Sequence, residues 1–226
     1  DFVRNVMDDS GYVPQVGDED DGTVAPLWSG STNRYCVVGR ALAQQIGAEP
    51  PPALTDADDA LCLWLFGNAP ASGTRLADSR LYPDGGYAVL HSERWHTLFD
   101  AGPLGLGSLA AHGHADALSL WASLDGKPLL IDTGTYAYHE DPEWRNHFRG
   151  TPAHNTIALD NRNQSEIQGP FLWGRKARSE FPRCDLRQRY VEGKTAAYAP
   201  DTVSRRVMLQ GETLIVQDRI EQDTAK

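Results

Sequence analysis

The most constraining feature of this sequence is a series of short apolar segments that begins after Gly73. Each segment has about the length of a β-strand, and polar turn residues separate it from the next. Two of the segments flank Asp125-Gly126, a dipeptide typical of two-residue hairpin turns. Many such strands with polar turns predict a mainly β fold, an antiparallel β-sandwich. The expected strands are GYAVLHS, RWHTLFDAG, LSLWASL, KPLLIDTG, HNTIALD, RSEFPRCDLRQRYVE, SRRVMLQ and ETLIVQDRIEQ.

The chain before this series has a helical and irregular pattern. The polar run Ser31-Thr32-Asn33 is suited to cap a helix that continues to Ile46 and stops before three consecutive prolines. Thr55 and Asp58 resemble a capping box, and the short apolar segment Ala60 to Phe66 follows them. Two short helices cannot form a core of their own, so we expect them to be the end of a larger helical domain.

These two patterns define the expected domains. Residues 1–72 are predicted to be a helical and linker remnant, and residues 73–226 to be the β-sandwich domain. The last strand reaches Lys226 without an obvious closing partner, which leaves open a truncated C-terminus. The chain starts without Met, so we interpret it as a fragment or a processed form.

Charge and composition exclude some classes of function. The net charge of −10 makes nucleic acid an unfavourable partner. Apolar content of 40% and charged content of 23% are typical of a soluble globular protein. No apolar run approaches membrane-spanning length, and no signal peptide is recognisable. The three cysteines are widely spaced and predict neither a zinc ribbon nor a disulfide framework.

Three side chains are candidates for a metal site. His114, Asp132 and His154 form a His₂Asp set, which is common for zinc and leaves a fourth position for water or substrate. Their wide spacing is weak support, because ordinary core and turn chemistry would explain the same residues. In that alternative, Asp132 caps a turn before Gly134, and a neighbouring group satisfies His154.

A shared metal requires the HGHAD segment to bend. If Asp125-Gly126 forms a two-residue turn, Asp132 faces Ser119 across the hairpin. His114 would then lie five residues further along, roughly 16 Å away if the chain is extended, with its side chain on the other face. The segment must therefore fold back as a loop, and Gly113 makes such a bend inexpensive.

Several other residues could act on a substrate, each with a plainer alternative. His112 could neutralise a carboxylate or move a proton, or it could simply face solvent. Tyr136 and Tyr138 could donate a phenolic proton, but strand aromatics often only pack. Arg145 and Arg149 could bind a carboxylate in fork geometry, although most arginines lie on the solvated surface.

The remaining polar and aromatic candidates are less specific. Asn155 could donate a hydrogen bond to a substrate carboxylate or hold a loop. The acidic stretch GDEDDG, residues 17–22, resembles a calcium loop but lacks the full ligand spacing, so we interpret it as a turn-rich loop with an interface role. Four aromatic side chains could stack on sugar rings or fill a core: Trp144, Phe148, Phe171 and Trp173.

Three segments taken together resemble one protein family. They are HGHADALSLWASLDGKPLLIDTGTYAY, FRGTPAHNT and NQSEIQGPFLWG, and the upstream YVPQVGDEDDG is similar to a linker in the same family. The family is that of the heparinase II/III-like polysaccharide lyases, and the resemblance is to its C-terminal β-sandwich. It implies that the helical remnant belongs to an N-terminal (α/α) toroid. It also implies zinc, in a structural role, with ligands at His114, Asp132 and His154.

The resemblance implies a function as well. Members of the family cleave uronic-acid polysaccharides, such as heparan sulfate or alginate, by β-elimination. Their principal catalytic Tyr and Asn or His come from the toroid, which this chain lacks, so we expect the chain by itself to be inactive. Its expected partners are an anionic polysaccharide and the missing toroid, and its expected location is the periplasm or outside the cell.

We therefore predict roles for nine residues. His112, Tyr136 and Arg149 are the predicted catalytic residues, and Tyr138, Arg145 and Asn155 the predicted substrate-binding residues. His114, Asp132 and His154 are the predicted zinc ligands. The alternative interpretation is a non-catalytic glycan-binding or interaction sandwich that keeps the metal site, and a structural cap for a helical domain is a third.

Overall fold

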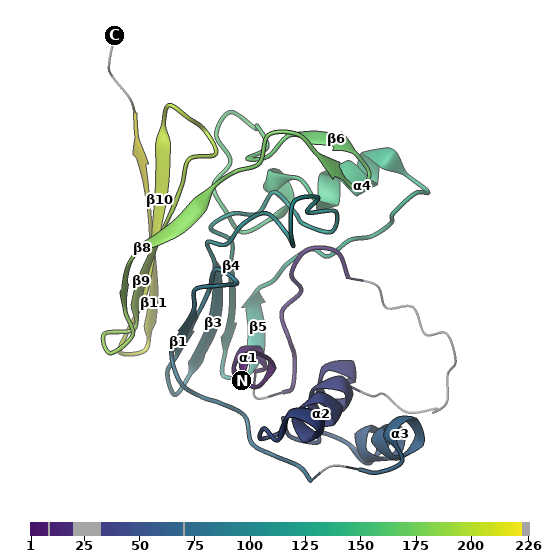
Figure 1. Ribbon diagram of the computed structural model, residues 1–226. Coiled ribbons are helices and arrows are strands. Elements are labelled where there is room, and N and C mark those ends of the chain that lie inside the picture. Colours follow the sequence, from purple (N-terminus) through teal and green to yellow (C-terminus); the bar gives the residue numbers. More distant parts are fainter. Residues whose placement is uncertain (9, 20–32, 70, 223–226) are drawn as a thin grey trace. The chain divides into compact units, whose positions relative to one another are not determined.

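The computed structural model describes residues 1–8, 10–19, 33–69 and 71–222. The chain divides into two compact units (Figure 1). One unit holds residues 1–13 and 21–78, and the other holds residues 14–20 and 79–226. A short segment from the N-terminal region, residues 14–20, therefore belongs to the second unit. Among the described residues, no helix is both long enough and apolar enough to cross a membrane.

The described part of the first unit contains three helices, and the caps of α2 and α3 follow from the sequence. The side chain of Asn33 accepts a hydrogen bond from the backbone N–H of Cys36 and so caps the second helix. Thr55 and Asp58 form the predicted capping box. The third helix begins at Asp56, earlier than the expected Ala60, because the capping box defines its first turn. Ser31 and Thr32 lie outside the described residues. The helices are α1 (Phe2–Val6), α2 (Arg34–Ile46) and α3 (Asp56–Phe66).

The second unit is the predicted antiparallel β-sandwich. One sheet has the order β1-β2-β3-β4-β5, and the other has the order β11-β10-β9-β8 (Figure 1). The first sheet contains β1 (Arg80–Tyr82), β2 (Tyr87–His91), β3 (Trp95–Asp100), β4 (Leu120–Leu124) and β5 (Lys127–Leu130). The second contains β8 (Ser179–Asp185), β9 (Tyr190–Thr195), β10 (Thr202–Gln210) and β11 (Thr213–Glu221).

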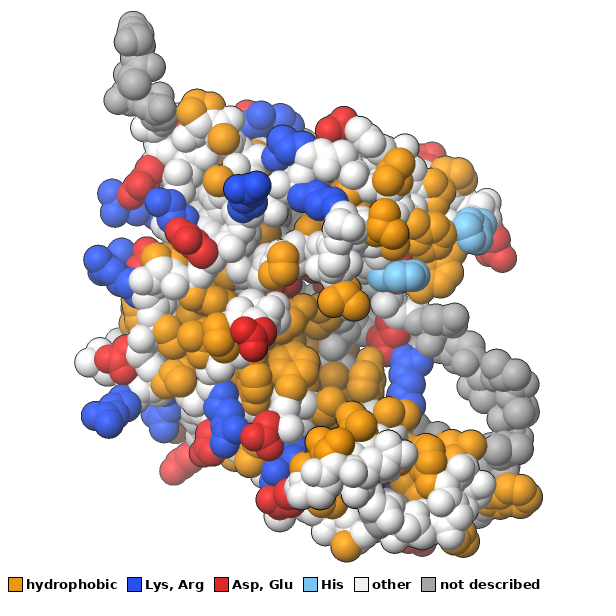
Figure 2. Space-filling model, viewed as in Figure 1, with side chains coloured by type: hydrophobic (Ala, Val, Ile, Leu, Met, Phe, Trp, Pro, Cys, Tyr) orange, Lys and Arg blue, Asp and Glu red, His pale blue; other side chains and the backbone are white. Residues whose placement is uncertain are grey.

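The core lies between these sheets, because both contribute to one cluster of buried apolar side chains. Leu90, Phe99 and Leu120 come from the first sheet, and Val191 and Val207 from the second. Residues alternate between buried and partly buried along β9 and β10, as expected for strands with one face on a core. The outer surface at the left of Figure 2, by contrast, carries interspersed basic and acidic side chains.

The β4–β5 hairpin confirms the turn predicted at Asp125-Gly126. Leu124 pairs with Lys127, and both turn residues have positive φ, as a type I′ turn requires. The pairing then shifts between Ala122 and Ser123, and β5 ends at Leu130. Asp132 therefore lies beyond the strand and does not pair with Ser119, which corrects the register expected from the sequence.

The segment predicted as the strand HNTIALD is instead a loop in the structure. Side chains, rather than a neighbouring strand, satisfy some of its carbonyl groups. The carbonyl of Ile157 accepts hydrogen bonds from Gln164 Nε2 at 3.3 Å and from Tyr198 Oη at 3.1 Å. Alternation of apolar residues predicted a strand here, but the carbonyl of Ile157 accepts from side chains instead of pairing with a strand.

Short elements gather at one end of the sandwich, near the loop that leads into β4 (Figure 1). They are α4 (Pro142–Phe148), the 3₁₀ turn η1 (Thr151–Ala153), and the hairpin of β6 (Ile167–Gly169) and β7 (Leu172–Trp173). The Asp141 side chain caps α4 by accepting from the N–H groups of Glu143 and Trp144, and Pro142 occupies its first turn. This end of the sandwich carries the candidate site.

Candidate functional site

His114, Asp132 and His154 converge in the folded chain. Each offers one ligand atom, and these atoms all lie within 4.8 Å of one another. The two imidazole rings are 5.1 Å apart between centroids, and His154 Nδ1 lies 2.7 Å from Asp132 Oδ2. The two histidine side chains are fully buried, and the Asp132 side chain is 9% exposed. His114 Nδ1 and His154 Nε2 are buried without a hydrogen-bond partner.

The HGHAD segment reaches this cluster because it is a loop between β3 and β4. Two non-glycine residues of the loop, Ala110 and Leu118, have positive φ values of 52° and 65°. Gly113 has no positive φ, and its role differs from the one we expected. A Cβ at this position would lie 2.9 Å from the backbone nitrogen of Gly105, so glycine is needed for close approach of two loops.

Hydrogen bonds from neighbouring elements hold the loops in place. Thr151 Oγ1 donates to the carbonyl of Ala115 at 2.6 Å, and Ala115 N–H donates to the carbonyl of Arg149 at 2.9 Å. The Asp132 carboxylate also accepts from Gly134 N–H at 2.8 Å, which is the turn-capping contact considered in the sequence analysis. The two interpretations of Asp132 are therefore compatible, because its other oxygen faces His154.

His154 has a perturbed pKa. Burial by itself lowers the pKa of this imidazole, but the hydrogen bond to Asp132 and the nearby charge of Asp116 raise it by more. The net effect is a raised pKa, so these carboxylates stabilise positive charge at His154. A cation at this position would experience the same field.

Asp18 joins this region from the segment 14–20, and no sequence motif singles it out. Its buried carboxylate accepts from His114 Nε2 at 3.0 Å, from His112 Nδ1 at 3.1 Å and from both terminal nitrogens of Arg145. Burial raises the pKa of Asp18, but hydrogen bonds from His114 and Arg145 outweigh that effect and lower it to about 2. The interface role expected for residues 17–22 did not single out Asp18, and residues 20–22 of that stretch lie outside the described residues.

His112 lies next to the cluster but faces outward. Its side chain is 67% exposed, whereas that of His114 is fully buried. The rings of Tyr138 and Phe171 lie edge-on to its ring, with centroid distances of 6.2 and 5.5 Å. We expected Tyr136 or Arg149 beside His112, but Tyr138 is the tyrosine in contact with it.

Tyr136 belongs to a separate aromatic group that it forms with Trp144 and Phe148 of α4. Its ring stacks on Phe148 with a centroid distance of 5.5 Å and an interplanar angle of 15°, and it also contacts Trp144. The residue is 71% exposed and has a φ of 63°, an uncommon conformation for a bulky side chain. Tyr136 and Trp144 therefore present ring surfaces to solvent.

Arg145 and Arg149 are fully buried rather than exposed to a ligand. Arg145 donates to Asp18 and to the carbonyl of Pro170, and Arg149 donates to the carbonyls of Gly169 and Pro170. Burial, followed by the charge of Arg145, lowers the pKa of Arg149 to about 10, at which it is still protonated at neutral pH. Both arginines hold the turn between β6 and β7, which favours a positioning role over direct contact with a ligand.

Asn155 is placed as a loop-holding residue. Its side-chain amide donates to the carbonyl of Ile131 at 2.7 Å, and so ties the loop after His154 to the end of β5. This corresponds to the second of the two roles considered for it from the sequence.

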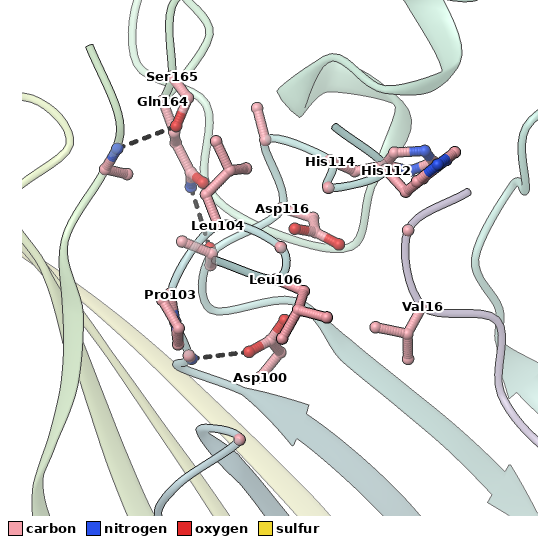
Figure 3. Close-up of a pocket in the computed structure, with 18 of the residues that line it drawn as sticks. Val16, Asp100, Pro103, Leu104, Leu106, His112, His114, Asp116, Gln164 and Ser165 are labelled. Atoms are coloured by element: carbon pink, nitrogen blue, oxygen red, sulfur yellow. Dashed lines mark hydrogen bonds between the residues drawn. The ribbon is translucent and has the colours of Figure 1, made fainter. Parts of the chain in front are cut away.

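A cavity of about 330 Å³ adjoins the two histidines (Figure 3). In Figure 3, His112 and His114 lie on one side, Gln164 and Ser165 on the other, and Asp116 between them. Its described lining includes Asp84, Asp100 and Asp116 besides Asp18, but neither lysine nor arginine. Burial and the charge of Asp116 raise the pKa of Asp100, and burial raises that of Asp116 despite His154 and His114. Asp18, whose pKa is lowered, stays ionised in this wall, and the described lining offers no lysine or arginine to pair with an anionic ligand.

Comparison with known proteins identifies the family of the chain. The sequence matches the family described as "Heparinase II/III-like, C-terminal" over residues 74–226. The chain belongs to this family. No curated protein matches the sequence.

Solved structures show the same fold. A heparinase III, the BT4657 gene product, has a TM-score of 0.66 and 19% identity, with 97% of this chain and 31% of that chain covered. The heparan sulfate lyase HepC from Pedobacter heparinus has a TM-score of 0.64 and 17% identity, with 96% of this chain and 30% of that chain covered. This heparinase II/III-like chain therefore spans about a third of the length of the solved structures that it matches.

Proposed function

We propose that this heparinase II/III-like chain is the C-terminal part of a polysaccharide lyase that cleaves uronic-acid polysaccharides by β-elimination. The observation that carries the proposal is the pair of histidines on one loop. His112 is exposed, while His114 is buried in a cluster with Asp132 and His154. Such a loop can present one imidazole to a substrate while the other is held inside the protein.

We propose further that the cluster holds a structural zinc ion. His₂Asp is a common donor set for zinc. The buried, unpartnered atoms His114 Nδ1 and His154 Nε2 fit a metal, because a buried nitrogen lone pair without a partner is otherwise costly. When bound, zinc would supply a crosslink between the loops that carry His114, Asp132 and His154. The His112 loop would be held in place as a result.

In β-elimination, a base removes the proton from C5 of the uronate and the C4–O bond breaks. The electrons of the C–H bond form a C4=C5 double bond, and an acid protonates the departing glycosidic oxygen. Charge that develops on the uronate carboxylate must be stabilised during this step. His112 is the group of this chain best placed to neutralise that charge or carry a proton, since its ring is exposed.

The other predicted residues support His112 in different ways. Tyr138 contacts the His112 ring and can line the same surface, and Tyr136 is an exposed phenol available as a proton donor. Arg145 and Arg149 hold the neighbouring turn from inside the protein. The acidic cavity is unsuited to a uronate, so we place the substrate on the outer side of His112.

The test uses the full-length protein with its helical domain, because this chain is expected to be inactive alone. Product formation is followed by the ultraviolet absorbance of the unsaturated uronate. His112→Ala should lower turnover by about 10²-fold while zinc content stays unchanged. His114→Ala should remove the zinc and lower the unfolding temperature. His139→Ala, an exposed histidine outside the cluster, serves as the matched control and should change neither quantity.

Two outcomes would contradict the proposal. If His112→Ala retains full turnover, the loop does not contribute to the reaction. If it loses zinc, the division of roles between the two histidines is wrong.

A second candidate function is glycan binding without catalysis. It is favoured by the exposed rings of Tyr136 and Trp144, since sugar rings stack on such surfaces. In this case the chain alone should be retarded in a gel that contains the polysaccharide, and Trp144→Ala should remove the retardation. His112→Ala should then have no effect, and the full-length protein should form no unsaturated product.

A further inference from the structure

We infer that Asp18 is a positioning residue that sets the orientation and the tautomer of both histidines in HGH. The expected effect of Asp18 on zinc binding rests on the proposed metal site. Its effect on the tautomers of the two histidines rests on the geometry of this chain alone. Asp18 comes from a segment far from the sandwich in the sequence, yet its side chain is fully buried in that unit.

The contacts of the Asp18 carboxylate are divided between its two oxygens. Oδ1 accepts from His114 Nε2 at 3.0 Å, and Oδ2 accepts from His112 Nδ1 at 3.1 Å. Arg145 occupies the remaining positions, with one terminal nitrogen on each oxygen and Nη2 at 2.6 Å from Oδ2. One carboxylate thus fixes two imidazoles and a guanidinium at the same time.

These contacts determine which nitrogen of each ring carries a proton. A neutral imidazole has one donor and one acceptor, and a carboxylate can only accept. His114 must therefore donate through Nε2, which leaves a lone pair on Nδ1. Nδ1 is the buried atom without a partner, and His114 is one of the three residues of the cluster. Asp18 therefore holds His114 in the tautomer that a metal requires.

The same reasoning gives the opposite tautomer for His112. It donates to Asp18 through Nδ1, so its lone pair lies on Nε2. Because the His112 side chain is mostly exposed, this leaves the basic nitrogen of an accessible ring available for proton transfer. Two histidines separated by one glycine thus use different nitrogens because they share one carboxylate.

The backbone supports the geometry. Asp18 N–H donates to the carbonyl of His112 at 2.8 Å, so the two segments are fastened to one another independently of the side chains. Gly17 has a φ of 64°, and a Cβ at that position would collide with the carbonyl oxygen of His112. The segment can therefore bring a carboxylate under the HGH loop only with a glycine before it.

The first experiment measures tautomers in this chain without metal. Nitrogen chemical shifts of ¹⁵N-labelled histidine at mildly alkaline pH distinguish a protonated Nδ1 from a protonated Nε2. We expect His114 to be protonated at Nε2 and His112 at Nδ1, and Asp18→Asn, which replaces one acceptor oxygen with a donor amide, to shift at least one ring away from its state. The inference is overturned if either ring of the wild-type chain has the other tautomer. It is also overturned if both keep their states in Asp18→Asn.

The second experiment measures zinc binding by competition with a chelator. Loss of such a hydrogen-bonded carboxylate typically weakens metal binding about 10- to 100-fold, so Asp18→Asn should show a loss of that size. The visible spectrum of the cobalt-substituted chain should change as well, which a merely structural role would not produce. Glu19→Gln removes the same charge one residue away and should match the wild type in both measurements.

The outcomes separate this inference from the proposed function. If the wild-type chain binds no zinc, the proposed metal site is wrong. The tautomer measurement, which needs no metal, still tests whether Asp18 positions the two histidines. If zinc binds equally well to Asp18→Asn and the wild type, Asp18 does not position the ligand. Should Asp18→Asn fail to fold, Asp18→Glu keeps the charge and provides the comparison. A shifted cobalt spectrum in this variant is then expected, and an unchanged one contradicts the inference.

Discussion

Replacing Arg205 with methionine tests how the second sheet holds the loops of the candidate site. Arg205 occupies an inward position of β10, where its neighbours in the alternation are apolar. Its Nη1 donates to the carbonyl of Leu118 at 2.9 Å and to the carbonyl of Asn155. These two carbonyls belong to the loops that carry His114 and His154. The guanidinium also forms a bidentate pair with Asp218, at 2.7 and 2.9 Å.

The size of the effect follows from these contacts. Methionine keeps the apolar stem but leaves two carbonyl oxygens without a donor, and each such loss costs about 1–3 kcal/mol when the group is buried. Asp218 is 40% exposed and can be hydrated again, so the ion pair adds at most about 1 kcal/mol. We therefore expect Arg205→Met to lower the free energy of unfolding by about 3 kcal/mol. For a protein of this size, that corresponds to a decrease of about 6–12 °C in the unfolding temperature.

Urea unfolding followed by tryptophan fluorescence measures the change. Arg206→Met is the matched control, because Arg206 is the next residue on the same strand but its side chain is 38% exposed. It forms an ion pair with Glu192, and its loss should cost less than about 1 kcal/mol. Equal losses of unfolding free energy in the two variants would refute this reasoning. They would mean that the inward position of Arg205 and its bonds to the two carbonyls add nothing to stability.

Two further predictions concern the core and the acidic cavity. Gly193→Ala places a Cβ 2.6 Å from Leu118 Cδ2, so we expect a loss of about 1–3 kcal/mol in urea unfolding. Gly169→Ala, with its nearest neighbour at 3.5 Å, should cost less than Gly193→Ala, and the reverse order would contradict the packing argument. The raised pKa of Asp100 means that its contribution to stability is present below the unfolded pKa of about 4 and is lost as the pH rises. Asp100→Asn should therefore raise the unfolding temperature more at pH 7 than at about pH 4, and an equal change at both would argue against a carboxylate destabilised by burial and by the charge of Asp116.

Features with local causes were predictable from the sequence. The turn at Asp125-Gly126 needs only two residues that tolerate positive φ, and the capping box at Thr55 needs only groups within one helical turn. The sandwich was predictable because alternating apolar residues indicate strands that are buried on one face. The three residues of the proposed zinc cluster were also identified, although their convergence depended on a bend that the pattern alone could not establish.

Features caused by distant contacts were not predictable in the same way. Asp18 contacts His114 across 96 positions and Arg145 across 127, and no local pattern reports such a pairing. In the sequence, Asp18 is one of several acidic residues in a loop. Arg145 and Arg149 have the spacing of a surface helix, and only the fold shows that they are buried. The roles of Asp18, Arg145 and Arg149 at this site could therefore be assigned only from the long-range contacts in the structure.

The assignment of residues 14–20 to the sandwich has a practical consequence for cutting and recombining such proteins. The family match begins at residue 74, and a boundary chosen there would separate Asp18 from the unit that it completes. Arg145 would then be a buried cation whose carboxylate partner had been left on another molecule. A transplanted sandwich should keep its geometry only if the short acidic segment is transferred with it, as an inserted segment or a covalently linked peptide. The structural unit is thus discontinuous in sequence, because it includes residues 14–20 in addition to the region that matches the family.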